Sequence, residues 1–266
     1  MDNKILEKEE NFHDDWAKSI NIDEVMVDEF FEACTSPENR LILNRLGNLE
    51  GKKILELGCG AGEASVYFAK KGALVTATDI SGGMLDVVQK VAQKHGFTVA
   101  TQQCFADSIP FDDEGFDIVY AANLLHHVEL ENTLKEVKRV LKSGGVFVSW
   151  DPIAHNPLIN IYRRKAMQVR TEDEHPIRMG QIKVFKKYFS DVCYDTTWFF
   201  TLWIFLKFYL IDKIDPNKER YWKKILVDNK KLEKTYYHLE KIDRWILKYL
   251  SFLKRYCWNI IIFAKK

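Results

Sequence analysis

The chain has 266 residues, of which 47% are hydrophobic and 29% charged, and its net charge is +1. This length and apolar content suit one α/β domain with a sizeable core, and the near-neutral charge argues against general nucleic-acid binding. The five cysteines form no Cys-x-x-Cys pair, which argues against a disulfide framework or a zinc site and favours a reducing compartment. The polar start does not resemble a signal peptide, and no apolar run reaches the roughly 20 residues of a spanning helix. We therefore expect a cytoplasmic protein.

Residues 1–50 are predicted to form an N-terminal helical cap. Apolar side chains recur at helical spacing from Phe12 to Cys34. Ser36 before Pro37 predicts the start of a further helix, because serine is a favoured N-cap and proline suits the first helical position.

Residues 51–152 alternate predicted strands with predicted helices. Strand–helix–strand units form parallel sheets with right-handed crossovers, so we expect a mostly parallel sheet with its ligand site at the carboxyl ends of the strands. The predicted strands are 53–57, 73–78, 97–102, 116–121 and 145–150, and the predicted helices are 62–71, 82–95 and 130–141.

The first of these strands runs directly into the glycine-rich turn Gly58-Cys59-Gly60-Ala61-Gly62. Glycine permits a tight turn, and the start of the following helix offers N–H groups to a ligand. The third glycine stands one position before that of the dinucleotide fingerprint, which disfavours an NAD-dependent enzyme. The next strand ends in Asp79, an acid that could accept both ribose hydroxyls of a bound nucleoside.

With these motifs the chain resembles the class I S-adenosylmethionine-dependent methyltransferases, particularly their small-molecule branch, over about residues 50–150. The resemblance implies a Rossmann-like α/β fold with a seven-stranded, mostly parallel sheet and an antiparallel last strand beside the fifth. The further matching stretches are Asp79-Ile80-Ser81 with Met84-Leu85, 106–111, 116–120 with His126-His127-Val128, and 139–145.

The resemblance implies S-adenosylmethionine as the cofactor. It assigns the amino-acid part of the cofactor to the glycine turn, the ribose to Asp79, the adenine to Asp107 and the methionine part to the residues after the fourth strand. Asp107 could instead be a turn-forming acid before Pro110, and Ile80 and Met84 could simply be core. The expected cofactor contacts are Glu56, Gly58, Cys59, Gly60, Gly62, Asp79, Ile80, Met84, Ala106, Asp107, Ser108 and Asn123.

Three histidines are candidates for a general base, because the pKa of histidine lies near working pH. His126 and His127 follow the fourth strand, and His155 follows the fifth, where Asp151 could orient it as an acid–base pair. Quinone O-methyltransferases of similar pattern carry metal-binding acids in the turn after the fourth strand. Asn123 and His126 stand in their place here, so we predict no metal site.

Residues 153–266 are expected to cover the substrate side of the cleft and to complete the same domain. Arginines after the fifth strand could grip a carboxylate or phosphate, although surface arginines are common. The candidate substrate contacts are Trp16 of the cap, Asp151, Arg163 and Arg170.

Two more strands are predicted at 189–200 and 258–264, with a helical insertion of about 55 residues between them, far above ordinary loop length. Its aromatic start, 198–209, could be a buried helix, an apolar substrate pocket or a membrane-facing surface. Residues 213–266 hold 15 Lys/Arg and 6 Asp/Glu, which indicates solvated helix faces or attraction to an anionic membrane. The predicted apolar face of the insertion comprises Leu239, Ile242, Ile246, Leu250 and Leu253.

The sequence therefore predicts an S-adenosylmethionine-dependent methyltransferase of a small or lipid-like acceptor, with the methylated atom open between oxygen, nitrogen and carbon. One alternative is a membrane-surface methyltransferase of a lipid or prenylated acceptor. Another is a non-catalytic module that binds the cofactor without turnover.

Overall fold

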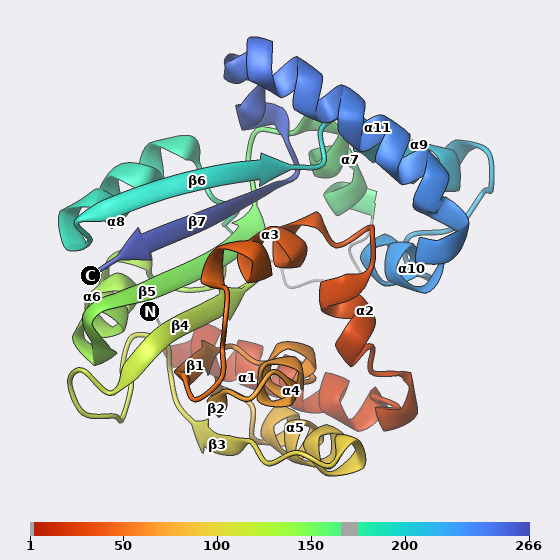
Figure 1. The fold of residues 1–266 in the computed structure, drawn as a ribbon. Coiled ribbons are helices and arrows are strands. Elements are labelled where there is room, and N and C mark those ends of the chain that lie inside the picture. The colour runs from red at the N-terminus through yellow and green to blue at the C-terminus, as the bar shows by residue number, and fades with distance from the viewer. Residues whose placement is uncertain (1–2, 166–174) are drawn as a thin grey trace.

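The structure is a computed structural model that describes residues 3–165 and 175–266. Its centre is a seven-stranded sheet with the order β3-β2-β1-β4-β5-β7-β6 (Figure 1). The strands are Lys53–Leu57 (β1), Leu74–Asp79 (β2), Ala100–Gln103 (β3), Phe116–Ala122 (β4), Leu141–Pro152 (β5), Asp191–Thr197 (β6) and Asn259–Lys265 (β7).

The strand pairing confirms the expected Rossmann-like sheet. β1 pairs in parallel with both β2 and β4, so the strand order reverses at β1. β7 runs antiparallel between β5 and β6, with Val148 opposite Phe263. A reversal of this kind leaves a crevice at the carboxyl ends of the central strands, where ligands bind in open α/β sheets.

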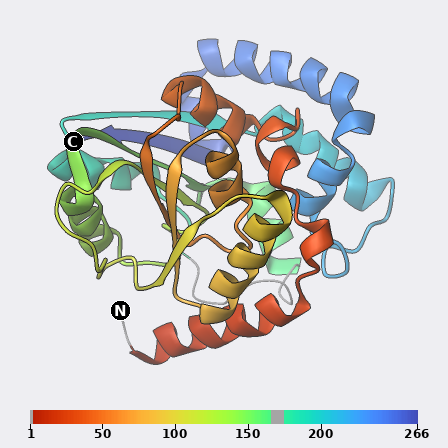
Figure 2. The ribbon, with the colours of Figure 1, turned by 60° about the horizontal axis from the view of Figure 1, so that its bottom comes forward.

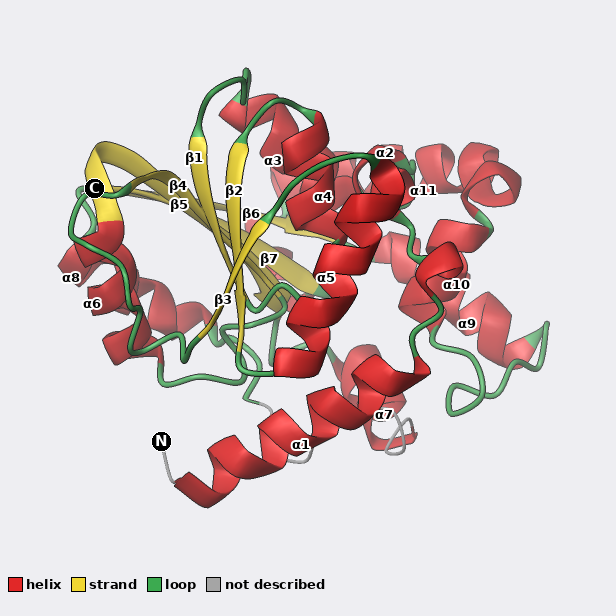
Figure 3. Ribbon diagram, turned by 90° about the horizontal axis from the view of Figure 1, so that it is seen from below, coloured by secondary structure: helices red, strands yellow, loops and turns green. Residues whose placement is uncertain are grey.

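Helices cover both faces of the sheet because alternate residues of a strand point to opposite sides (Figure 3). Ile54 of β1 packs in one core with α4 (Glu63–Lys70) and α5 (Gly82–His95). Leu55 packs in the other with α6 (Leu130–Val140) and α8 (Ile182–Tyr188).

β3 and β5 differ in length from the predicted strands, because hydrogen bonds at a helix end shorten β3 and pairing with a neighbouring strand lengthens β5. β3 begins at Ala100 rather than at residue 97, because the N–H of Phe97 donates to the carbonyl of Ala92 and completes the end of α5. β5 extends to Pro152 because β7 pairs with it along that length.

The helical pattern predicted from Phe12 to Cys34 is divided between two helices, α1 (Asn3–Ser19) and α2 (Val27–Glu32). The next helix, α3 (Pro37–Leu46), begins at Pro37 as predicted. Asn21 breaks the first run, because its side chain accepts from the N–H of Asp23 and caps a short 3₁₀ turn. α1 packs on the start of α5, where Asp14 accepts from the N–H of Gly83 at 3.1 Å.

After β5 the chain forms α7 (Pro157–Lys165), and the insertion between β6 and β7 carries α9 (Trp203–Leu210), α10 (Tyr221–Val227) and α11 (Asn229–Tyr249). Figures 1 and 2 show α11 as an outermost helix, beyond β6 and β7. None of the described helices has the length and apolar character needed to cross a membrane.

The buried face of α11 differs from the predicted one. Leu239 is buried as expected, but Leu250 is 45% exposed. The helix instead turns inward around Asp243, whose carboxylate accepts from the N–H groups of Phe199, Phe200 and Thr201. These hydrogen bonds override the simple apolar stripe, because the N–H groups of the turn after β6 need acceptors.

Candidate functional site

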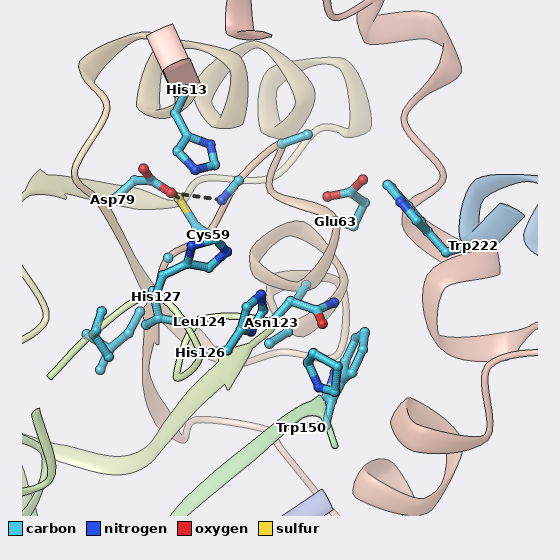
Figure 4. A pocket seen from close by; sticks show the side chains of 18 of the residues that line it. His13, Cys59, Glu63, Asp79, Asn123, Leu124, His126, His127, Trp150 and Trp222 are labelled. Carbon is cyan, nitrogen blue, oxygen red and sulfur yellow. Dashed lines mark hydrogen bonds between the residues drawn. The ribbon is translucent and has the colours of Figure 1, made fainter. Parts of the chain in front are cut away.

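A cavity of about 420 Å³ lies at the carboxyl ends of the central strands (Figure 4). One end reaches the glycine turn and the ends of β2 and β4, and the other reaches α7, α10 and β7. α1 contributes a wall, so cap, core and insertion all border one continuous space.

The glycine turn is fastened to the second strand. Gly60 has a φ of +50° and donates its N–H to Asp79 Oδ2 at 3.0 Å, and the N–H of Cys59 donates to the carbonyl of Thr78 at 2.9 Å. Gly62 has a φ of +87°, and a Cβ there would lie 2.9 Å from Val88 Cγ2 on α5. Glycine is required at both positions, by the left-handed backbone at each and by close helix packing at Gly62.

Asp79 stands at the centre of this end of the cavity. Its second oxygen, Oδ1, accepts from the N–H of Ser81 at 3.0 Å, so the carboxylate joins the glycine turn to the start of α5. Burial raises the pKa of Asp79, and His13 of α1 opposes that shift from above. Each carboxylate oxygen can accept a further hydrogen bond, so Asp79 can still receive ribose hydroxyls.

Two more acids border the turn. Glu56 accepts from the Ser65 hydroxyl, and burial raises its pKa to about 8, with Glu63 and Asp79 adding to the shift. Burial also raises the pKa of Glu63. Three carboxyl groups in so small a space favour a cationic ligand.

Glu56 makes the stability of the ligand-free protein pH dependent. The folded state holds the proton more tightly than the unfolded chain, so this stabilisation is complete below the ordinary pKa of 4.5 and is lost as the pH rises to about 8. We expect the melting temperature to fall between about pH 5 and pH 8, and Glu56→Gln to show a shallower fall. An equal fall of the melting temperature with pH in the wild type and in Glu56→Gln would contradict a protonated Glu56.

Nine of the twelve expected cofactor contacts line the cavity. They are Glu56, Gly58, Cys59, Gly60, Asp79, Ile80, Ala106, Asp107 and Asn123. The other three lie elsewhere: Met84 is fully buried in the core between α5 and the sheet, and Gly62 and Ser108 do not border the space. Met84 points inward because it stands in the first turn of α5, where its N–H donates to the Ser81 hydroxyl.

The histidine pairing differs from the prediction. Asp151 contacts His126, with Nδ1 and Oδ1 2.8 Å apart, and also accepts from the N–H of His126. His155 does not border the cavity, and burial together with Arg255 and Arg178 lowers its pKa. The reason is strand geometry: β4 and β5 are neighbours, so the turn after β4 meets the end of β5.

His126 and His127 both line the cavity (Figure 4). Asp151 is 1% exposed, and its Oδ1 faces Nδ1 of His126. The ring of His127 lies 4.1 Å from that of His126, and its Nδ1 lies 3.7 Å from Glu9 of α1. His126, held on a buried carboxylate, can take up a proton from a bound molecule.

The far end of the cavity is aromatic. Five of the seven tryptophans line the cavity: Trp16, Trp150, Trp198, Trp222 and Trp258. Arg163 lines it as well, whereas Arg170 falls outside the described residues. Arg220 also lines the cavity. This position was not expected from the sequence, because no motif or spacing links Arg220 to the core.

Comparison with known proteins shows which family the central part of the chain resembles. Residues 55–149 match the model of the family described as Methyltransferase domain. An uncharacterised methyltransferase of Synechocystis is 34% identical over 122 residues, which are 45% of this chain and 55% of that protein. The sterol 24-C-methyltransferase of Gibberella zeae is 30% identical over 136 residues, 50% of this chain and 36% of that protein. Residues 55–149 therefore carry the pattern of a methyltransferase domain.

The fold agrees with that assignment. The crystal structure of the YcgJ protein of Bacillus subtilis aligns with a TM-score of 0.54 and 20% sequence identity, over 85% of this chain and 97% of that one. The matched part spans only about half, or less, of the length of the curated relatives. The resemblance to methyltransferases implies S-adenosylmethionine as the cofactor.

The residues of the methyltransferase domain fit that cofactor. S-adenosylmethionine is positive at its sulfonium and ammonium groups, and Glu56, Glu63 and Asp79 surround the glycine turn with carboxyl groups. Apart from Gly60 and its two chain neighbours, no described residue has an atom within 4 Å of the place where a Cβ of Gly60 would stand, so a ligand can approach the backbone there. Charge and space therefore both suit the cofactor.

Proposed function

We propose that this protein transfers the methyl group of S-adenosylmethionine to an apolar, lipid-like acceptor. The observation that carries the proposal is the single cavity that joins the glycine turn to a chamber walled by tryptophans. Apolar and aromatic walls suit a ligand with little polar surface. The sterol acceptor in the name of one relative belongs to the same chemical class.

The chain would hold the cofactor through its own polar groups. The glycine turn would receive the amino-acid part, Asp79 the ribose and Asp107 the adenine. When bound, S-adenosylmethionine supplies an electrophilic methyl carbon, so the protein mainly has to orient the acceptor in line with it and exclude water. The α1 cap and the tryptophan walls serve that exclusion.

His126 would remove the proton that the acceptor loses. The bound cofactor would supply the methyl group, and His126 would accept the proton that the acceptor atom loses on methylation. Asp151, 2.8 Å from Nδ1, orients the ring and stabilises its positive charge. The proton then leaves to solvent as the products depart.

The test is transfer of tritium-labelled methyl from S-adenosylmethionine to a total lipid extract. We expect label in the organic phase with the wild-type protein and none with Asp79→Ala. Label confined to water-soluble molecules would contradict the lipid-like acceptor. Binding of the cofactor without label in any fraction would favour the non-catalytic module instead.

A second candidate is action at an anionic membrane surface, and the exposed face of α11 favours it. Trp245 and Tyr249 are each 65% exposed on that face, with ring centroids 5.6 Å apart, and Phe252 beyond the helix is equally exposed. Exposed basic side chains run along the same face, namely Lys230, Lys234, Lys241, Arg244 and Lys248. Aromatic and basic side chains together are typical of helices that lie in a membrane interface.

Vesicle flotation tests this surface. We expect the protein to float with vesicles that contain phosphatidylserine and not with pure phosphatidylcholine, since each lysine near an anionic surface contributes about 1 kcal/mol. Changing Lys234, Lys241 and Lys248 together to Glu should reduce flotation more than tenfold. A matched triple change of the exposed Lys90, Lys135 and Lys138 to Glu should have little effect. Equal losses in the two triple variants would show attraction by overall charge and contradict a docking face on α11.

A further inference from the structure

An arginine of the insertion reaches the cavity without an acidic partner. Arg220 precedes α10 and lines the cavity, and its guanidinium carbon lies 4.4 Å from the ring centre of Trp16 on α1. Within residues 3–165 and 175–266, no carboxylate lies within 4 Å of its guanidinium, and no hydrogen bond from that group is formed. This cation–aromatic contact joins α1 to the start of α10.

Two other part-buried arginines, Arg40 and Arg139, are paired. They lie 3.1 and 2.8 Å from carboxylates, and their side chains are 27% and 31% exposed. Burial lowers the pKa of Arg220, and Tyr162 opposes only part of that shift, so withdrawal from water disfavours its charge. A charge withdrawn from water is costly unless it gains a partner.

We propose that Arg220 binds an oxyanion of the acceptor, a carboxylate or a phosphate. A guanidinium stacked on an indole keeps its in-plane N–H donors directed outward, which suits a planar or tetrahedral oxyanion. The tryptophan walls would hold the apolar body of the same molecule. The acceptor is then an anionic amphiphile, and this inference rests on the proposed methyltransferase function.

The geometry also assigns Trp16 a part in this subsite. Its ring contacts Arg220 and also lies 5.8 Å from the ring of His13, which stands one turn earlier on α1 and borders the cavity. Bringing the acceptor's anionic end to Arg220 would therefore place it beside the cap, while its apolar part extends toward Trp198 and Trp258. The cap and the insertion would both close on a bound acceptor.

The experiment compares decanoate with decan-1-ol, two probes of equal chain length that differ in charge. Binding is followed by tryptophan fluorescence, since five tryptophans line the cavity. We expect the wild type to bind decanoate at least tenfold more tightly than decanol, Arg220→Met to lose that preference, and Arg220→Lys to keep part of it. The matched control is Arg255→Met. It removes another arginine that lies over an aromatic ring, with its guanidinium carbon 5.7 Å from the ring centre of Tyr256, but Arg255 is outside the cavity.

Two results would overturn the inference. One is equal binding of decanoate and decanol by the wild type, or an unchanged preference in Arg220→Met. The other is a loss of S-adenosylhomocysteine affinity of more than tenfold in Arg220→Met, which would mean that the arginine holds the carboxylate of the cofactor. The proposed function is judged separately, because it fails if the wild type does not bind the cofactor or transfers no methyl group to the lipid fraction.

Discussion

Replacing Asp79 by alanine is expected to weaken the binding of S-adenosylhomocysteine at least a hundredfold. The change removes the acceptor for the ribose hydroxyls and also the two hydrogen bonds, from Gly60 and Ser81, that hold the glycine turn in place. Hydrogen bonds to a charged group contribute about 1.5–3 kcal/mol each, so losing two or more exceeds the roughly 2.7 kcal/mol of a hundredfold change. Isothermal titration calorimetry measures the effect.

The control for Asp79 is Asp86→Ala, which removes an exposed acid from α5. We expect it to bind S-adenosylhomocysteine as the wild type does. Thermal melts of both variants establish that they are folded at the temperature of the titration. A folded Asp79→Ala protein with near wild-type affinity would contradict the assignment of Asp79 to the ribose.

The second large effect is expected at His126. His126→Ala should lower kcat for methyl transfer by about 10²–10⁴-fold while S-adenosylhomocysteine still binds, because general base catalysis contributes about that much. Asp151→Asn should lower kcat less and shift the pH profile, since the neutral amide no longer stabilises a protonated ring. The measurement is the initial rate of methyl transfer at a series of pH values, with the lipid fraction that takes up label in the lipid assay as the acceptor.

His155→Ala serves as the control for the histidine pair. His155 does not border the cavity, so its loss should leave kcat close to that of the wild type. If His126→Ala retained full activity, the acceptor would attack without help from this base. If His155→Ala were the inactive variant, the contact between His126 and Asp151 would have no role in catalysis.

The glycine turn and the strand alternation were predictable because their causes are local. The spacing of Gly58, Gly60 and Gly62 reflects left-handed backbone, and Asp79 follows an apolar strand. The helix 82–95 was predicted with its observed bounds because Ser81 caps its start and Gly96 adopts the left-handed conformation at its end.

The pairing of Asp151 with His126 required the order of the strands. Sequence proximity favoured His155, which lies four residues after Asp151. The parallel register of β4 and β5, with Ala122 opposite Trp150, instead brings the turn after β4 to the end of β5. A prediction that placed β5 beside β4 could have found this pair.

The aromatic chamber and Arg220 could not be predicted from local pattern. Trp16 and Arg220 are about 200 residues apart, and Trp258 comes from the last strand region. Their proximity arises only when the cap and the insertion fold over the same end of the sheet. The buried face of α11 was mispredicted for a related reason, since Asp243 turns inward to satisfy N–H groups of a distant turn.

The most direct test is a calorimetric titration of the wild-type protein with S-adenosylmethionine. The account predicts one binding site with micromolar affinity, because the glycine turn, Asp79 and the acids around them are already arranged for a cationic nucleoside. Failure to bind either S-adenosylmethionine or S-adenosylhomocysteine at millimolar concentration would contradict the methyltransferase function and leave the cavity to a different ligand.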